Sequence, residues 1–228
     1  MDDLLDHWKS VLIISDEIAN EQIGEIRIGI TESLAKKIIP KIIEWLEVYR
    51  PKMIAEFDMG NTKRMYELVQ SNKVDMAFCG EDVESAYHLE FKKFAEERIL
   101  FVVYADHALL NKDTLTLTDI LEYPLVMGDK TCISNRKFMK VLEKNKLLHR
   151  LKKQYVCSNP MLIPDILPAN YVGILTKSNM TEKTGDIEIL EYEDSELEMI
   201  YGIITKKREH DYLEKTTKKL IELLKYEF

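Results

Sequence analysis

The sequence predicts an α/β fold made of two consecutive halves, and three observations support this prediction. Short apolar segments of strand length alternate with longer segments in which apolar residues recur at helical spacing. This alternation runs through the chain twice, without an internal sequence repeat. No low-complexity linker separates the halves, so we expect the apolar strands near 97–104 and 199–205 to join them and to act as the hinge.

Residues 1–23 are predicted to form an amphipathic helix. Leu4, Val11 and Ile18 recur every seven residues, and Trp8 and Leu12 lie beside them, so that one apolar stripe runs along the segment. A helix with such a stripe is marginal in water on its own. We therefore expect the stripe to dock on the body of the protein or on a second copy of itself.

The first half is predicted to alternate strands and helices, with parallel pairing between the strands. Gly24 ends the opening helix, and Pro40 either kinks the next helix or marks its start. The elements expected, in order, are a strand over 26–30, a helix over 34–49, a strand over 53–57, a turn over 58–61, a helix from Thr62 and a strand over 74–79.

The second half repeats this rhythm and ends on an amphipathic helix. Thr118 or Asp119 is expected to cap one helical turn, and Pro160 to stand just inside a short helix. The other elements expected are strands over 97–104, 125–128, 154–157, 171–175, 187–192 and 199–205, a helix through Phe138, Val141 and Leu142, and a final helix over 210–226.

Composition and charge narrow the classes of function. The 228 residues carry a formal net charge of −8, whereas binding to a nucleic-acid backbone requires a basic face. No stretch reaches the roughly 18 continuous apolar residues of a membrane span, and the acidic N-terminus does not resemble a signal peptide. Cys79, Cys132 and Cys157 form no CxxC pair, which is typical of reduced thiols. We therefore predict a cytoplasmic protein with no membrane contact.

Motifs of catalysis or metal binding are not found in the sequence. It contains no G-x-S-x-G, P-loop or G-x-G-x-x-G pattern, and its five histidines are scattered. We therefore expect no enzymatic activity, no metal and no cofactor. Two alternatives are weaker. Cys132 beside Lys130 could be a redox-sensing thiol. The basic runs 149–153 and 206–208 could bind anions, but exposed helix or loop ends are the favoured interpretation of both runs.

Hydroxyl, amide and amine side chains recur where a predicted strand ends and a helix begins. In a parallel α/β sheet these positions face a crevice at the carboxyl ends of the strands, where ligands bind. Helix N-termini there carry free N–H groups and favour a carboxylate or a similar anion. Helix capping alone would also explain any single one of these residues. The residues concerned are Thr31 and Ser33, Asn61 and Thr62, Lys130 and Thr131, and Ser158 and Asn159.

In order along the chain, these segments resemble the effector-binding domain of LysR-type transcriptional regulators. Each motif is loose alone, and their order is what makes the resemblance specific. The segments that carry it are GEIRIGITESL at 24–34, IIPKIIEWLEVYRP at 38–51, MIAEFDMGNTKRMYELVQSNKVDMAF at 53–78, ERILFVVYADHAL at 97–109 and TLTLTDILEYPLVM at 114–127.

The resemblance implies a type 2 periplasmic-binding-protein-like fold with two Rossmann-like lobes and a central cleft. Lobe I would comprise 24–103 plus 204–228, lobe II would comprise 104–203, and 1–23 would be a linker helix. The linker would dimerise through Leu4, Trp8, Val11, Leu12 and Ile18, giving a homodimer or tetramer.

The ligand implied by the resemblance is a small effector between the lobes. By position, the family's ligand-binding residues correspond to Thr31, Ser33, Asn61, Thr62, Gly128, Lys130, Thr131 and Ile174. Lys130 favours a carboxylate, while Glu32 and Asp129 would suit an amine.

Three departures from the family pattern accompany the resemblance. The winged helix-turn-helix that would contact DNA is not within these residues, Asn170 replaces a usual glycine, and the close cysteine pair of peroxide sensors is missing.

Two rival functions share the fold. A solute-binding protein would need an export signal, and an enzyme resembling prephenate dehydratase or a phosphoribosyltransferase would need catalytic groups in the cleft.

Overall fold

The structure is a computed structural model that describes residues 24–82, 88–180, 185–192, 194–207 and 211–225. The predicted opening helix, with Leu4, Trp8, Val11, Leu12 and Ile18, lies outside the described residues.

The first half of the chain alternates strands and helices as predicted. Its elements are β1 (Gly24–Thr31), α2 (Glu32–Tyr49), β2 (Met53–Gly60), α3 (Thr62–Gln70) and β3 (Met76–Gly80). The strand β1 pairs in parallel with both β2 and β3. Its isoleucines at 26, 28 and 30 are buried against α2, as the alternation of apolar residues predicted.

The rest of the chain contains two long antiparallel strands and a second set of parallel strands. The first group of elements comprises β4 (Leu89–Tyr104), η2 (Ala108–Asn111), α4 (Leu117–Leu121), β5 (Leu125–Gly128), α5 (Ile133–Lys144), η3 (Leu148–Arg150) and β6 (Gln154–Cys157). The second group comprises η4 (Pro160–Leu162), α6 (Ile163–Ile166), β7 (Val172–Thr176), η5 (Lys177–Asn179), β8 (Ile187–Ile189), β9 (Glu198–Lys206) and α7 (Asp211–Leu224).

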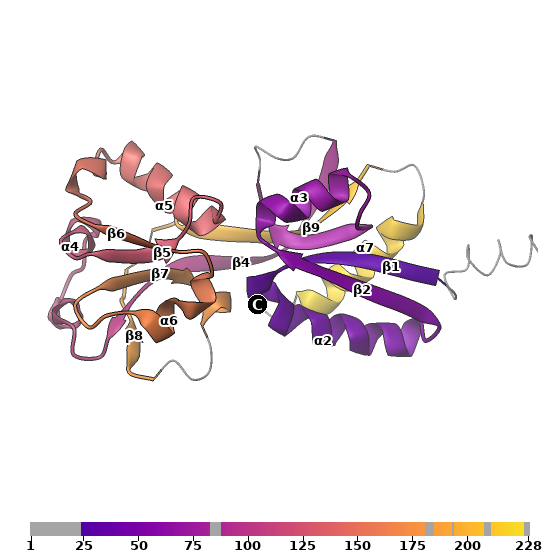
Figure 1. Ribbon diagram of the computed structural model, residues 1–228, viewed down its shortest axis with the longest axis horizontal. Helices are drawn as coiled ribbons and strands as arrows, with labels where there is room; N and C mark the ends of the chain where they lie inside the picture. The colour runs from indigo at the N-terminus through magenta and orange to yellow at the C-terminus, as the bar shows by residue number, and fades with distance from the viewer. Residues whose placement is uncertain (1–23, 83–87, 181–184, 193, 208–210, 226–228) are drawn as a thin grey trace, which may run out of the picture.

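The described strands form one sheet in the order β2-β1-β3-β9-β4-β7-β5-β6, with β8 paired to β4. The strand β4 joins its two parts, because residues up to Arg98 pair with β9 and residues from Ile99 pair with β7. In Figure 1 the helices α2 and α3 lie on opposite faces of the first part, and α5 and α6 on opposite faces of the second. The final helix α7 lies with the first part. Below, "first half" means β1–β3 with α2 and α3, and "second half" means β5–β8 with α4–α6.

The helix α2 begins at Glu32 and contains Pro40, so of the two alternatives offered for Pro40 the start of the helix is excluded. Three local predictions need correction. The strand β2 continues to Gly60, through the turn predicted at 58–61. The cap of α4 is Thr116 rather than Thr118 or Asp119. The strand β4 begins at Leu89, because its early residues pair with β9 despite their charged sequence.

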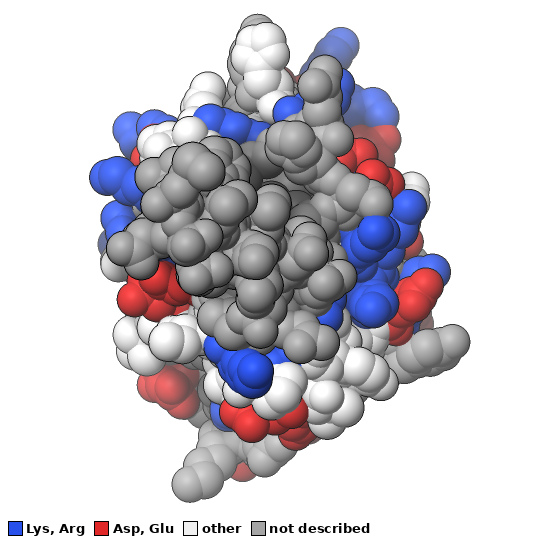
Figure 2. Space-filling view, turned by 90° about the vertical axis from the view of Figure 1, so that its right-hand side faces the viewer, with Lys and Arg blue, Asp and Glu red and all other residues white. Residues whose placement is uncertain are grey.

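The described surface carries charges of both signs. Figure 2 shows Lys and Arg side chains standing beside Asp and Glu on the face that it draws. None of the helices in the described part of the chain is both long and apolar enough to cross a membrane.

Candidate ligand-binding site

A cavity of about 420 Å³ lies where the carboxyl ends of β1, β2, β5 and β6 meet. The helices α2, α3 and α5 begin at its wall, so three helix N-termini face one space. This is the crevice expected at the carboxyl ends of parallel strands. Its volume equals that of roughly 14 water molecules in the liquid, which is enough for a small metabolite.

Five of the eight predicted ligand-binding residues lie in the cavity wall. They are Thr31, Ser33, Asn61, Thr62 and Thr131. Ser158 and Asn159, the fourth pair of polar residues at a strand end, line it as well. The structure therefore brings residues from four separate strand ends together. Binding of a ligand by them stays a prediction.

The other three predicted residues lie elsewhere. Gly128 ends β5 beneath Cys132, so close that a β-carbon on Gly128 would stand 2.8 Å from the β-carbon of Cys132. Lys130 is exposed outside the wall, and Ile174 is buried in the core.

The Thr31 hydroxyl is held at the start of α2 with its hydrogen-bonding capacity unused. Thr31 is the N-cap residue, yet its side chain makes no capping hydrogen bond. It is 6% exposed, and its Oγ1 has no hydrogen-bond partner among the described residues. Burying a hydroxyl without a hydrogen-bond partner costs free energy, so a polar ligand atom that bonded to it would be stabilised. The first N–H groups of the 18-residue helix α2 lie beside it.

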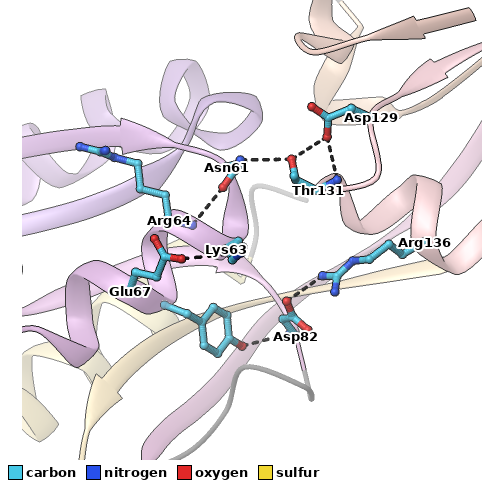
Figure 3. A network of polar contacts seen from close by, with 9 residues as sticks. Asn61, Lys63, Arg64, Glu67, Asp82, Asp129, Thr131 and Arg136 are labelled. Atoms are coloured by element: carbon cyan, nitrogen blue, oxygen red, sulfur yellow. Dashed lines mark hydrogen bonds and ion pairs between the residues drawn. The ribbon is translucent and has the colours of Figure 1, made fainter.

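Asn61 and Thr131 contact each other across the cavity (Figure 3). The Asn61 Oδ1 accepts from the Arg64 backbone N–H at 2.9 Å, so the Asn61 Nδ2 faces outward and donates to the Thr131 Oγ1 at 3.2 Å. The Thr131 hydroxyl in turn donates to the Asp129 Oδ1 at 2.5 Å. The polar chain therefore runs from the first half of the chain to a carboxylate in the second.

A second polar contact, between Arg136 and Asp82, joins the halves (Figure 3). The Arg136 Nη2 lies 2.7 Å from the Asp82 Oδ2, and the Asp82 backbone N–H donates to the Tyr66 hydroxyl at 3.0 Å. Asp82 is only 5% exposed, so water screens this ion pair less than a surface pair. Burial raises the pKa of Tyr66 well above its usual range, and the hydroxyl therefore stays protonated at neutral pH.

Several lining residues were missed by sequence reasoning. Tyr201 from β9 and Met199 beside it line the wall, as do Thr176 and Asn179 at the end of β7. The Thr176 Oγ1 donates to the Asn179 Oδ1 at 2.9 Å and lies 3.4 Å from the Tyr201 hydroxyl. Burial raises the pKa of Tyr201 well above its usual range. Thr176 and Asn179 form a capping box after a strand, so the signal that identified the other polar wall residues could have identified them. Nothing in the sequence marks Tyr201 as a wall residue.

The wall carries few charges. Glu32 at the start of α2 and Asp129 in the β5–α5 loop are carboxylates, and Arg64 is the cation. The Arg64 Nη2 lies 3.0 Å from the Asp58 Oδ1, so its guanidinium is paired within the first half.

Other chemistries find little support among the described residues. No three His, Cys, Asp or Glu side chains gather as metal ligands would within the described residues. The three cysteines are free thiols, and burial raises the pKa of Cys79 well above its usual range. Cys132 lines the cavity at the start of α5, with its Sγ 3.0 Å from the Ser134 hydroxyl.

The chain is similar in sequence to a known domain family and to known transcriptional regulators. The model of the LysR substrate binding domain matches residues 19–228. The HTH-type transcriptional regulator YtlI of Bacillus subtilis is 21% identical over 222 residues, which make up 96% of this chain and 70% of that regulator. The regulator CysB of Burkholderia cenocepacia is 25% identical over 134 residues, and the match covers 59% of this chain and 43% of CysB.

Solved structures show the same fold. The cofactor-binding domain of the Cbl transcriptional regulator superposes with a TM-score of 0.74 at 16% identity, covering 90% of this chain and 89% of that one. The regulatory domain of CcmR from Synechocystis, in complex with 2-PG, gives a TM-score of 0.72 at 14% identity over 89% of this chain and 98% of that one. The effector-binding domain of QuiR in complex with shikimate gives 0.71 at 16% identity over 90% and 97%.

Proposed function

This chain belongs to the family of LysR substrate-binding domains, and we propose that it is the effector-sensing part of a LysR-type transcriptional regulator. In this proposal a small metabolite with a carboxylate group binds in the cavity and changes how the regulator holds DNA. DNA contact would be made by a winged helix-turn-helix outside the 228 residues. The relatives named above are transcriptional regulators, and we propose no enzymatic activity for the chain.

One observation supports the anionic ligand above the others. The N-termini of α2, α3 and α5 converge on the cavity, where the unpartnered Thr31 hydroxyl is buried. Each helix N-terminus adds about half a positive charge and N–H groups without partners in the helix. A carboxylate placed there would accept hydrogen bonds from these groups and from Thr31.

The signal would be a change in closure between two lobes. We propose the division into lobe I at 24–103 plus 204–228 and lobe II at 104–203. The exchange of pairing partner along β4 near Ile99 supports a boundary within this strand. The pairs Asn61–Thr131 and Arg136–Asp82 would stabilise the closed arrangement. An effector shifts the closure equilibrium only if it binds one arrangement more tightly.

The proposed path to DNA runs through residues 1–23. These would form a linker helix that dimerises through its apolar stripe at Leu4, Trp8, Val11, Leu12 and Ile18. A homodimer or tetramer built in this way would carry the closure change to the DNA-binding domains, as expected for a cytoplasmic regulator.

The cavity can be tested by calorimetric titration of a panel of small carboxylates into wild type and the variant Thr31→Val. Removing the hydroxyl should weaken a bound carboxylate by about tenfold, since one hydrogen bond to a charged group contributes roughly 1.5–3 kcal/mol. Thr118→Val, on a helix remote from the cavity, is the matched control and should bind as wild type does.

Unchanged affinity in Thr31→Val would show that the carboxylate does not bind at α2. Turnover of a panel compound that is lost in Thr62→Ala would overturn the non-enzymatic part of the proposal.

A further inference from the structure

The charges of the cavity wall do not suit a ligand that is only anionic. Two carboxylates, Glu32 and Asp129, stand in the wall, and the guanidinium of Arg64 is already paired with Asp58. The amine of Lys130, which would have balanced them, is exposed outside the wall. A dianion or a simple acid would therefore meet two like charges there without an uncommitted cation among the described wall residues.

Asp129 presents an oxygen that its own loop does not use. Its Oδ1 accepts from the Thr131 backbone N–H at 2.7 Å and from the Thr131 hydroxyl at 2.5 Å. Its Oδ2 has no partner in the part of the chain that the structure describes, and the side chain is half-buried in the wall. The contact between Asn61 and Thr131 holds the Thr131 hydroxyl as an acceptor towards Asn61 and a donor towards Asp129. Both hydrogen bonds from Thr131 therefore fall on the Asp129 Oδ1, and the Oδ2 stays available to accept one from a ligand.

The remaining wall offers complementary groups for the rest of a ligand. The Thr31 hydroxyl and the N-terminus of α2 supply donors for a carboxylate, as the proposed function requires. Met59, Met161 and Ile133 supply apolar surface in the same wall. The wall therefore offers donors, an acceptor carboxylate and an apolar area within one cavity.

We propose, resting on the function proposed above, that the ligand is a zwitterion of the α-amino-acid type with an apolar side chain. Its carboxylate binds at the N-terminus of α2 with Thr31, and its ammonium group donates to the Asp129 Oδ2. Glu32, exposed at the first position of α2, adds a second negative charge to the wall that the ammonium group offsets. The ammonium group neutralises the carboxylates that would repel a simple acid, and Asp129 is the residue that determines this specificity.

The test compares matched ligands on wild-type protein by calorimetric titration. The probes are the L-α-amino acids with aliphatic or thioether side chains, each paired with the acid of the same skeleton that lacks the amino group. At least one amino acid should bind about tenfold or more tightly than its deaminated partner, because a charge-assisted hydrogen bond is roughly twice as strong as one between neutral groups.

The same pair is then titrated into Asp129→Asn, with Asp113→Asn in an exposed loop as the control. Asparagine keeps an acceptor for Thr131 and removes the charge. The preference for the amino acid should fall to about threefold or less in Asp129→Asn and stay unchanged in Asp113→Asn. Glu32→Gln, at an exposed site, should reduce the preference less than Asp129→Asn does, and it gives a second reading if Asp129→Asn does not fold.

Two outcomes separate this inference from the proposed function. Carboxylates that bind in a Thr31-dependent manner, with no preference for an amino group on any skeleton, would overturn the zwitterion and leave the sensing function standing. If no amino acid and no other carboxylate in the panel bound, both the zwitterionic ligand and the proposed sensing function would be overturned.

Discussion

At the scale of single residues, the hydroxyl groups around the cavity differ in what they can offer a ligand. The Thr131 hydroxyl gives its proton to Asp129, and the Thr176 hydroxyl gives its proton to Asn179. Both can then only accept. The Thr31 hydroxyl has no partner in the described structure, so it can still donate. Although all three are threonines at strand ends, Thr31 is the one whose removal should affect an anionic ligand most.

His107 is a buried histidine whose proton has a definite position. Its Nδ1 accepts from the Leu109 backbone N–H at 3.2 Å, so the proton of the neutral ring lies on Nε2. That Nε2 is buried without a partner among the described residues, and the ring packs at a tilt against Tyr123 with the ring centroids 4.5 Å apart. Burial lowers the pKa of His107, and nearby Asp106 offsets only part of the shift.

This lowered pKa predicts a loss of stability in mild acid. Between the folded pKa and the unfolded value of about 6.5, the unfolded chain binds more protons than the folded one. The contribution of His107 is therefore fully present above about pH 6.5 and is lost as the pH falls through that window. Urea unfolding of wild type and His107→Asn from pH 5 to 8 measures it, since asparagine retains an acceptor for Leu109 but does not titrate.

The pH dependence of the unfolding free energy should be weaker in His107→Asn than in wild type below about pH 6.5. Equal slopes for the two proteins would show that His107 does not carry the acid sensitivity.

At the scale of elements, hydrogen bonds at a helix N-terminus fix where the helix begins. The helix α4 has only five residues, and it begins with a reciprocal capping box between Thr116 and Asp119. The Asp119 backbone N–H donates to the Thr116 hydroxyl at 3.2 Å, while the Asp119 carboxylate accepts from the Thr116 backbone N–H at 2.9 Å. Lys112 also pairs with Asp119, and this pair and the bonds from Thr116 lower the Asp119 pKa to about 2.

The substitution Thr116→Ala should destabilise the protein by about 1 kcal/mol, the usual effect of losing an N-cap side chain. The helix is short, and its buried Leu117, Ile120 and Leu121 depend on a correct start. Chemical unfolding measures the change. Thr118→Ala, at the position that the sequence offered as an alternative cap, should change stability by less than about 0.5 kcal/mol. Equal losses in the two variants would contradict the assignment of the cap.

The sequence predicts those elements best whose signals are local. The strands β5 and β6 match their predicted bounds, because apolar residues are flanked there by proline, glycine or polar residues. The early part of β4 was missed because residues 89–96 mix apolar and charged side chains without a clear period. Their strand conformation depends on pairing with β9, more than a hundred residues away.

The same division holds for the cavity. Thr31, Asn61 and Ser158 were found because a polar residue between a strand and a helix is a local signal. Tyr201 was missed because it lies within a strand and reaches the cavity only through the path of β9 across the sheet. Which residue of β9 reaches the cavity depends on how all the strands are arranged in the sheet, and a short segment of sequence does not contain that arrangement.

At the scale of the whole molecule, α5 connects the cavity with the contacts between the halves. Its N-terminus forms part of the cavity wall, and Arg136 one turn further on binds Asp82 of the segment after β3. Its neighbour Lys137 donates to the backbone carbonyl of Glu198 at the start of β9, and burial lowers the Lys137 pKa. A ligand that moves the start of α5 would therefore strain or relieve the Arg136–Asp82 contact, which reaches the segment after β3.

We predict that Arg136→Gln shifts the ligand-free protein towards a more open arrangement. Asp82 is 5% exposed, and loss of the Arg136 guanidinium would leave its buried carboxylate with less compensating charge, so opening to water would become more favourable. Small-angle X-ray scattering should give a larger radius of gyration for the variant than for wild type, and a bound effector should reduce the difference, since it favours closure. Lys144→Gln is the control, because the Lys144–Glu196 pair also begins on α5 but is solvent-exposed and should contribute little. A radius of gyration unchanged in Arg136→Gln, with the fold intact by circular dichroism, would mean that the pair between the halves does not hold them closed.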